Sequence, residues 1–459
     1  MSSANSPAQG FDIEVFIDRQ KVSAYQWAIL ALCFLIVAAD GFDTAAAGFI
    51  APAVAKEWGL TRLALGPLLS AALIGSVVGA LTSGPLADRI GRKRVLAVSV
   101  LMFGILSLAC AKAGSAQMLT ILRLLSGIGL GAAMPNATTM VSEYMPKKHR
   151  ALLVNVMFCG FTLGASVGGF AAAGLIPAFG WQSIFVVGGA IPVLLALALF
   201  AWLPESVRFM VANSWPTEKI NMVLSYIAGK TVAERHFAFT EPAEGKEKSP
   251  IALILSKRLR CGTVLLWITY FMGLLVYFLM TSWLPTLMKE GGMSLQQASL
   301  ITALFPLGGG LGAIVCGLLM DRVNAYRVVA FTYVLTGAFI WWIGQSVGNT
   351  LLIGLLTFLA GSCMNGAQIS MPVLAAAFYP TNGRASGVAW MLGIGRIGGI
   401  MGALAGGAML EAGFGVASIL QALSVPAFIA AGALLINNHL GKRWIDFDSI
   451  LRKSHSKSN

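Results

Sequence analysis

Two aspartates stand inside a long apolar stretch near the start of the sequence. Asp40 and Asp43 belong to the run AADGFDTAAAGFIAP, and the nearest charged residues on either side are Lys21 and Lys56. A spacing of three places both carboxylates one turn apart on one face of a helix. Carboxylates in such surroundings pair with cations or carry protons. The two residues are therefore candidates for charge or proton transfer.

Two arginines, Arg123 and Arg396, are the other clear ionisable residues of the apolar stretches. A guanidinium presents a planar fork of donors that matches a carboxylate, so Arg396 is the candidate for binding an anionic substrate. Arg123 is the candidate partner of Asp43. Because two carboxylates one turn apart repel each other, we expect one of them to hold the proton, and we assign it to Asp40. Glu143 is the alternative proton site.

The composition places these residues in a membrane. The chain has 459 residues, of which 57% are hydrophobic and 11% charged, whereas a soluble protein of this size needs a far more charged surface. Uncharged gaps mark spans of about 20 residues each, and two gaps of double length are broken by the turn signals PAFGWQ and VGNT. The count is twelve spans. The predicted fold class is an all-α polytopic membrane protein.

The depth of each charge follows from its distance to the ends of its span, at ~1.5 Å per residue. Arg396 is 12 residues from Arg384 and 15 from Glu411, which places it near the middle of the membrane. Asp43 and Arg123 reach comparable depths, so they are predicted to form an ion pair. Each charge costs at least ~2.5 kcal/mol at the membrane centre unless it is paired or hydrated. A purely structural salt bridge would use one residue of each sign and leave the others unexplained.

The basic residues of the short loops predict the orientation. If the DRIGRKR loop is cytoplasmic, the inner loops carry ten basic residues and the outer loops four, so both termini are cytoplasmic. The net charge of +13 fits an anionic inner leaflet and requires no nucleic acid. The first twenty residues lack the features of a signal peptide. No cysteine pair has ligand spacing, so neither a metal nor a disulfide is expected.

An internal repeat divides the chain into two parallel halves. PAVAKEWG recurs as PTLMKEGG 233 positions later, and GPLADR recurs as GLLMDR at the same offset. The central loop contains an amphipathic piece, TEKINMVLSYI, which is expected on the inner face of the membrane. The predicted domains are a cytoplasmic N-terminal segment (1–23), an N-terminal six-helix bundle (24–203), a cytoplasmic central loop (204–261), a C-terminal six-helix bundle (262–437) and a cytoplasmic tail (438–459).

Two six-helix halves joined by a long basic loop resemble the major facilitator superfamily. GPLADRIGRKR is similar to its signature between the second and third helices, and RLLSGIGLG to its fourth-helix motif. DGFD, PESVRF and RASGVAWMLGIGRIGG most resemble the aromatic acid:H+ symporter family. The resemblance implies the major facilitator fold and proton symport of a small aromatic carboxylate, of the hydroxybenzoate or protocatechuate type, by alternating access. It also implies a place in the bacterial inner membrane and a link to aromatic catabolism.

The signature loop is interpreted as a conformational latch. Asp88 stands at a helix end, where a carboxylate can cap a neighbouring helix and basic residues can bind helix carbonyls. The preference for basic residues in cytoplasmic loops would explain the Arg and Lys residues of this loop. It would not explain why the aspartate is repeated as Asp321 in the second half. The residues assigned to the latch are Gly84, Asp88, Arg89, Gly91, Arg92, Asp321 and Arg322.

The predicted substrate site combines Arg396 with polar and aromatic residues of the spans. Asn365 and Gln368 share one helix face and serve equally well as links between helices or as substrate contacts. Aromatic residues such as Tyr270 either form walls of the site or only pack. The full set is Arg396, Asp43, Tyr277, Asn365, Gln368 and Trp390.

Other function classes compete with this one. PESVRF also resembles the sugar-porter loop, and a first-helix acid with a fourth-helix arginine is similar to drug:H+ antiporters. Neutral sugars and cationic drugs have little use for Arg396, which favours an organic anion. A membrane sensor of aromatic acids is a further alternative. There is no nucleophile with a base, no phosphate loop and no metal cluster, so an enzyme is not expected. The expected partners are the acid anion, protons and the lipid bilayer, with no cofactor and a monomeric chain.

Overall fold

The computed structural model describes residues 11–229, 237–238, 250–346 and 348–455. Twelve helices in these ranges are long and apolar enough to cross a membrane, which confirms the predicted number of spans. The N-terminal bundle consists of α2 (Ala24–Trp58), α3 (Arg62–Ile90), α4 (Arg92–Cys110), α5 (Ala116–Tyr144), α6 (Lys147–Phe179) and α7 (Gln182–Trp202). The C-terminal bundle consists of α11 (Arg260–Glu290), α12 (Leu295–Arg322), α13 (Ala325–Gln345), α14 (Thr350–Phe378), α15 (Thr381–Glu411) and α16 (Val416–His455).

Local signals in the sequence explain where several spans begin and end. Ser23 and Gln26 form a capping box at the start of α2, and Gly59, with a φ of 61°, follows its last turn. The predicted turn PAFGWQ separates α6 from α7, and in VGNT the side chain of Asn349 caps the first turn of α14. The predicted tail 438–459 is helical as far as His455, as a continuation of α16.

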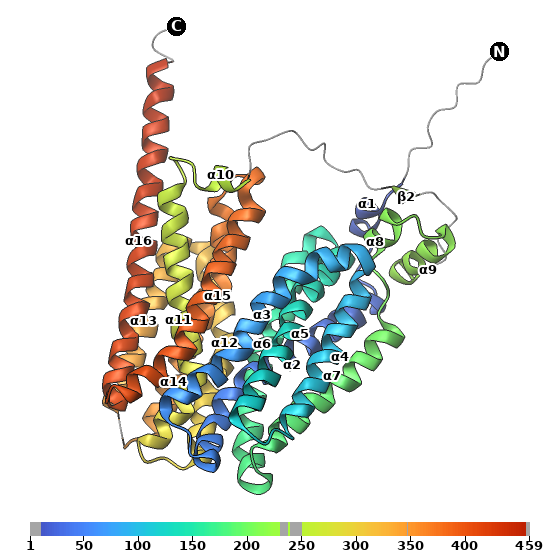
Figure 1. The fold of residues 1–459 in the computed structure, drawn as a ribbon. Helices are drawn as coiled ribbons and strands as arrows, with labels where there is room; N and C mark the ends of the chain where they lie inside the picture. Colours follow the sequence, from blue (N-terminus) through green and yellow to red (C-terminus); the bar gives the residue numbers. More distant parts are fainter. Residues whose placement is uncertain (1–10, 230–236, 239–249, 347, 456–459) are drawn as a thin grey trace, which may run out of the picture.

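Short elements gather at one end of the two bundles (Figure 1). Beside the N-terminal bundle lie α1 (Ile13–Asp18), α8 (Val207–Ala212) and α9 (Thr217–Ala228), and beside the C-terminal bundle lies α10 (Pro250–Ile254). We call this the terminal end and the opposite one the distal end. Apart from helices, the described residues contain one parallel pair of two-residue strands, β1 (Phe11–Asp12) and β2 (Phe237–Ala238).

The helix α9 corrects one expectation from the sequence. It is amphipathic as predicted, but the buried part of its apolar face packs on protein, while Met222 and Tyr226 remain more than half exposed. Ile220, Leu224 and Ile227 are buried in a cluster with Ile13 and Ile17 of α1. A second segment of the chain therefore covers this part of the apolar face, which the sequence analysis had placed on the membrane.

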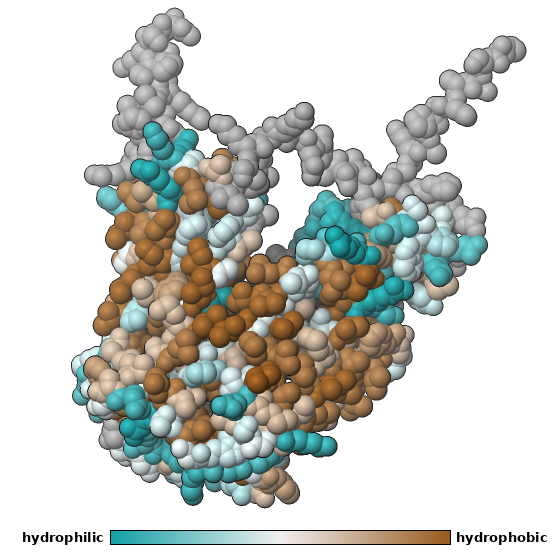
Figure 2. Space-filling view, viewed as in Figure 1, coloured by the Kyte–Doolittle hydropathy of each residue, from teal (hydrophilic) through white to brown (hydrophobic). Residues whose placement is uncertain are grey.

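The two bundles meet along three pairs of helices, α2 with α11, α6 with α12 and α3 with α15. Glycines permit the closest approach: a Cβ on Gly48 of α2 would lie 2.3 Å from the carbonyl oxygen of Thr281 in α11. The bundles converge toward the distal end and diverge toward the terminal end, where the space-filling view shows a hollow between them (Figures 1 and 2). Apolar side chains cover the flanks of both bundles, and polar ones gather at the two ends (Figure 2).

Candidate functional site

Asp43 and Arg123 form a buried ion pair inside the N-terminal bundle. Asp43 Oδ2 lies 2.6 Å from Arg123 Nη1, and both residues are 1% exposed. Arg123 Nη2 also donates to the backbone carbonyl of Asp43 at 3.1 Å, and the hydroxyl of Ser107 donates to Asp43 Oδ1 at 3.3 Å. The guanidinium carbon lies 5.7 Å from the centre of the Phe185 ring. Two neighbouring helices, α4 and α5, thus supply the polar partners that the buried carboxylate on α2 needs.

Asp40 has a different environment from Asp43, although it lies one turn away on the same helix. It is 7% exposed, and its Oδ1 accepts a hydrogen bond of 3.1 Å from the hydroxyl of Thr44. Among the described residues, no basic side chain lies within 4.0 Å of the Asp40 carboxylate. Its electrostatic partners include Asp43 and Arg123 on its own bundle, and Arg396 and Tyr277 on the other. Asp40 therefore interacts with a charge on the facing bundle, that of Arg396.

Arg396 reaches across that interface. Its Nη1 donates to the carbonyl oxygen of Ser76 at 3.1 Å, and Ser76 lies halfway along α3 just as Arg396 lies halfway along α15. Tyr270 of α11 is a second electrostatic neighbour, and its ring lies against Gly395, where a Cβ would come within 2.2 Å. A guanidinium with one backbone acceptor retains donors for a ligand. Arg396 and Asp40 thus place opposite charges on the two facing bundles.

The other residues predicted to bind substrate differ in how deeply they are buried and in whether their polar groups have partners. Tyr277 is 5% exposed, and its ring lies 5.9 Å from that of Phe305. The side-chain amide of Asn365 donates to the carbonyl of Gly361 at 2.9 Å. Both amide atoms of Gln368 are buried against α11 without a hydrogen-bond partner among the described residues. Trp390 is 44% exposed and stacks on Trp267.

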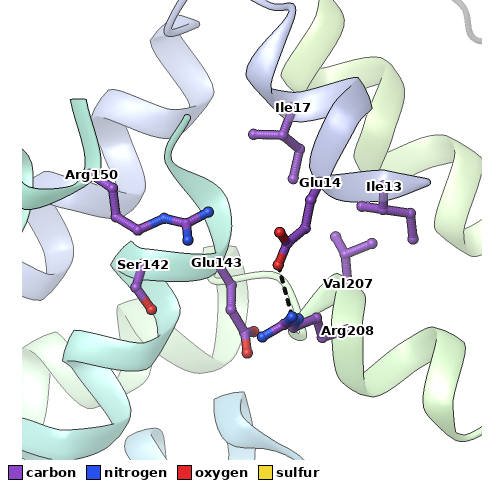
Figure 3. A pocket seen from close by; sticks show the side chains of 8 residues that line it. All are labelled: Ile13, Glu14, Ile17, Ser142, Glu143, Arg150, Val207 and Arg208. Carbon is purple, nitrogen blue, oxygen red and sulfur yellow. Dashed lines mark hydrogen bonds and ion pairs between the residues drawn. The ribbon is translucent and has the colours of Figure 1, made fainter. Parts of the chain in front are cut away.

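The structure separates Glu143 from the aspartate pair. Glu143 lies on α5 twenty residues beyond Arg123, about 30 Å along the helix axis. It pairs there with Arg92 and accepts a hydrogen bond from the hydroxyl of Ser206. It also lines a small cavity with residues of α1 and α8 (Figure 3). Its position favours a role in the terminal end rather than in proton transfer at the membrane centre.

The helix cap expected of Asp88 is made by another residue in this conformation. The side chain of Asp88 is 71% exposed and lies 3.5 Å from Arg92. Glu205 Oε1 accepts the backbone N–H groups of Arg92 at 2.8 Å and Lys93 at 3.0 Å, and so caps α4. The remaining latch residues Gly84, Arg89, Asp321 and Arg322 are exposed, and Gly84 has open space around it.

Gly91 is required by this cap. Its φ is +102°, and a Cβ there would lie 2.3 Å from Glu205 Oε2. Only glycine adopts such a backbone without strain and leaves room for the carboxylate. Glu205 belongs to the PESVRF motif, and the sequence alone predicted no role for it. The signal that points to it is an acid placed directly after the last span of the first half.

Inter-bundle polar contacts close the distal end. Arg62 at the start of α3 pairs with Glu290 at the end of α11, with Nε and Oε1 2.9 Å apart. Lys289 Nζ donates to the carbonyl oxygen of Pro52 at 3.3 Å. Lys289 and Glu290 belong to the repeated KE motif, and Glu57 of the first copy accepts from the indole N–H of Trp181 at 2.7 Å. The two copies thus serve different contacts, one between the bundles and one within a bundle.

Reversing one charge of the distal pair is expected to open this end. Arg62→Glu or Glu290→Arg places like charges opposite each other, which shifts the conformational equilibrium by about 1 kcal/mol, or roughly fivefold. The measurement is labelling of a cysteine substituted for buried Thr286, one turn before Glu290, by an impermeant thiol reagent. Labelling should rise in each single variant and return to the original rate in the swapped double variant. A swapped variant that labels as fast as the single ones would contradict the contact.

Comparisons with known proteins agree with this architecture. A family model described as Major Facilitator Superfamily matches residues 33–296 and 266–446. The chain is 53% identical to the 4-hydroxybenzoate transporter PcaK of Pseudomonas putida, over 94% of this chain and 97% of the relative. It is 48% identical to a gallate transporter of Pseudomonas putida, over 93% of this chain and 95% of that one. A 3-(3-hydroxy-phenyl)propionate transporter of Escherichia coli is 34% identical over 88% and 91%.

Among solved structures, a D-xylose-proton symporter superposes with a TM-score of 0.70 at 17% sequence identity. The match covers 90% of this chain and 97% of that one, and at this identity it bears on the fold alone. The two six-helix bundles, the repeated loop motifs and the relatives agree with one another. The chain therefore belongs to the major facilitator superfamily and, within it, to the family that contains these aromatic acid transporters.

Proposed function

We propose that the protein imports a small aromatic carboxylate together with a proton, by alternating access in a bacterial inner membrane. The observation that carries the proposal is the placement of Asp40 and Arg396 on facing bundles, where their charges interact. Relatives with 53% and 48% identity are named as transporters of 4-hydroxybenzoate and gallate. Both compounds are hydroxylated benzoates, so an acid of this class is the proposed substrate.

In this mechanism Arg396 binds the carboxylate of the substrate. Its fork of donors suits two carboxylate oxygens, and its hydrogen bond to Ser76 occupies only Nη1. Because Ser76 belongs to the other bundle, the binding of substrate at Arg396 affects the contact between the bundles. Tyr270 of α11 interacts electrostatically with Arg396, and Tyr277 of the same helix interacts with Asp40. We propose these two tyrosines as walls for the aromatic ring.

We assign the proton to Asp40 because the carboxylate of its neighbour, Asp43, already has hydrogen-bond partners. Both carboxylate oxygens of Asp43 have partners, in Arg123 and Ser107. Asp40 has the weaker support of one hydroxyl, Thr44, and a second carboxylate one turn away. The proton on Asp40 compensates the charge of the substrate. An anion alone would have to enter against about 2.3 kcal/mol per 100 mV of inside-negative potential.

The distal end and the terminal end of the bundles have separate roles in the proposed transport cycle. The Arg62–Glu290 pair closes the distal end, whereas the bundles are apart at the terminal end. With both termini in the cytoplasm, as the loop charges predict, this conformation is open to the cytoplasm and releases substrate there. The reverse conformation has to break the distal pair and bring the terminal ends of the bundles together.

Uptake into vesicles tests the proposed function directly. Purified protein in liposomes receives radiolabelled 4-hydroxybenzoate, gallate, benzoate or xylose, with the outside one pH unit more acidic than the lumen. We expect accumulation of hydroxybenzoates, acidification of the lumen alongside, and no uptake of xylose. Protein-free liposomes measure passive diffusion of the protonated acid. Uptake of the acids that is independent of the pH difference would refute proton symport, and uptake of xylose alone would refute the substrate class.

Replacement of Arg396 by lysine tests its role in binding. Arg396→Lys keeps the charge but replaces the planar fork by a single ammonium, so affinity for 4-hydroxybenzoate is expected to fall by at least tenfold, about 1.4 kcal/mol. The measurement is direct binding in detergent, with Arg384→Lys as a control at the terminal end of the same helix. Wild-type affinity in Arg396→Lys would remove this residue from the site.

A further inference from the structure

The N-terminal segment of the described chain, residues 11–18, lies against the N-terminal bundle and the helices of the central loop (Figure 1). Ile13 and Ile17, one turn apart on α1, are 1% and 4% exposed. They share an apolar cluster with Val207 of α8 and Leu224 of α9. A helix of six residues is not stable alone in water, so this packing holds it in place.

The face of α1 next to these isoleucines is acidic and binds two basic residues. Glu14 Oε1 lies 2.7 Å from Arg208 Nη2 of α8, and Glu14 Oε2 lies 3.1 Å from Lys147 Nζ at the start of α6. Figure 3 shows Glu14 directed toward Arg208, with Glu143 and Arg150 nearby. One carboxylate thus joins the first turn of a central-loop helix to the first turn of a membrane span.

Asp18 caps the N-terminus of α6. The residue before this helix is Pro146, and α6 has no side-chain cap of its own. Asp18 Oδ1 accepts the backbone N–H of Lys147 at 2.6 Å, and Asp18 Oδ2 lies 3.8 Å from its Nζ. A carboxylate at this position satisfies an N–H that the helix leaves unpaired and interacts favourably with the helix dipole. The cap comes from a distant part of the chain.

Two further links tie the same region together. Phe11 and Asp12 pair in parallel with Phe237 and Ala238 of the central loop. The hydroxyl of Tyr144 donates to the carbonyl of Glu205 at 2.7 Å, where the central loop begins. The cavity between α1, α5, α6 and α8 is about 40 Å³, a volume on the order of a few waters. The segment therefore packs against the bundle with only a small cavity beside it.

We propose that residues 11–18 form a clasp that fixes α8 and α9 to the N-terminal bundle and stays closed while the two bundles rock. This inference rests on the proposed transport function. Rocking of rigid bundles requires that each bundle keep its own contacts as the interface changes. The caps of α4 and α6 come from Glu205 and Asp18, two segments outside the spans. When the clasp is released, both caps lose their support and the terminal end no longer moves as one body.

The docking itself is tested without any substrate. In detergent, trypsin cleaves at exposed Lys219 of α9 only as fast as this helix is released from the bundle. Glu14→Gln and Asp18→Asn are each expected to accelerate this cleavage about fivefold or more. Glu411→Gln, an exposed acid at the distal end, is the matched control and should cleave like the wild type. Equal cleavage in all four proteins overturns the clasp, whichever substrate the protein carries.

A bridging experiment tests whether the clasp stays closed during transport. The variant Glu14→Cys/Arg208→Cys is made in a Cys261→Ser background, since native Cys261 is exposed. Its turnover in 4-hydroxybenzoate counterflow should fall about tenfold with KM within about twofold, because conformational exchange and not the binding site is affected. A short bis-thiol reagent that bridges the two cysteines should restore turnover.

The outcomes of the bridging experiment are distinct. Restored turnover supports a clasp that stays closed throughout the cycle. Turnover that stays low or disappears on bridging overturns the proposal, because it means that the segment has to open in each cycle. Wild-type turnover before bridging overturns it as well. A wild-type protein that exchanges no aromatic acid refutes the proposed function instead, and the cleavage experiment then decides the clasp alone.

Discussion

Asp40→Asn is expected to abolish uptake against a gradient while exchange of internal for external substrate continues. Asparagine keeps the size of the side chain but cannot carry a proton, so the substrate is no longer coupled to the pH difference. For one proton per anion, one pH unit is worth about 1.4 kcal/mol, a tenfold accumulation by wild-type protein. The variant should equilibrate at a ratio of about one, a loss of the whole driving force.

Both activities are measured in the same proteoliposomes, as pH-driven accumulation and as counterflow. Asp40→Glu, which keeps a titratable group, is the control and should retain part of the accumulation. A pH-sensitive dye in the lumen reports the cotransported proton. If Asp40→Asn still concentrates substrate and acidifies the lumen, the proton site is elsewhere, and Asp43 becomes the next candidate.

Asp43→Asn is expected to impair stability and transport more than Asp40→Asn does, because it leaves the charge of Arg123 without its partner in the middle of a bundle. Arg123 is 1% exposed and its nearest partner is Asp43 at 2.6 Å. Removing one member of a buried ion pair costs roughly 3–5 kcal/mol. We expect a clear drop in the apparent melting temperature in detergent, a lower yield, and loss of both accumulation and counterflow.

A double variant separates the stability effect from the transport effect. Asp43→Asn/Arg123→Gln removes both charges, and replacement of a whole buried pair by neutral groups is often close to neutral for stability. Its melting temperature should recover most of the loss, while transport stays absent if the pair also serves the mechanism. Ser107→Ala removes only the 3.3 Å hydrogen bond to Asp43 and should have a small effect. A wild-type melting temperature in Asp43→Asn would show that Arg123 has another partner.

The membrane architecture was predictable because its signals are local in the sequence. Spans are long apolar runs between charges, and all twelve were found from them. The repeated KE and DR motifs divided the chain into two halves. The Asp43–Arg123 pair was also foreseen from depth along the helices, since few ionisable residues inside the spans leave few choices of partner. The prediction of the fold class and of the buried ion pair therefore requires little beyond helix geometry and the free-energy cost of burying a charge.

Two features depended on how the helices pack. Helix rotation decides that Asp43 contacts Arg123 while Asp40 interacts with Arg396 across the interface, because spacing alone puts both aspartates on one face. The separation of Glu143 from that site, by contrast, follows from the length of α5 alone. The docking of α8 brings Glu205, and not Asp88, to the first turn of α4.

The clasp shows what the sequence by itself determines and what it leaves to the tertiary structure. Hydropathy periodicity predicted an amphipathic helix at TEKINMVLSYI, and α9 forms there. An apolar face has the same pattern whether lipid or protein covers it, and only the tertiary structure brings Ile13 and Ile17 against it. Likewise, Asp18 caps α6 across more than a hundred residues. Burial of charge and helix length act within one segment, whereas the partner of a loop side chain depends on where the rest of the chain lies.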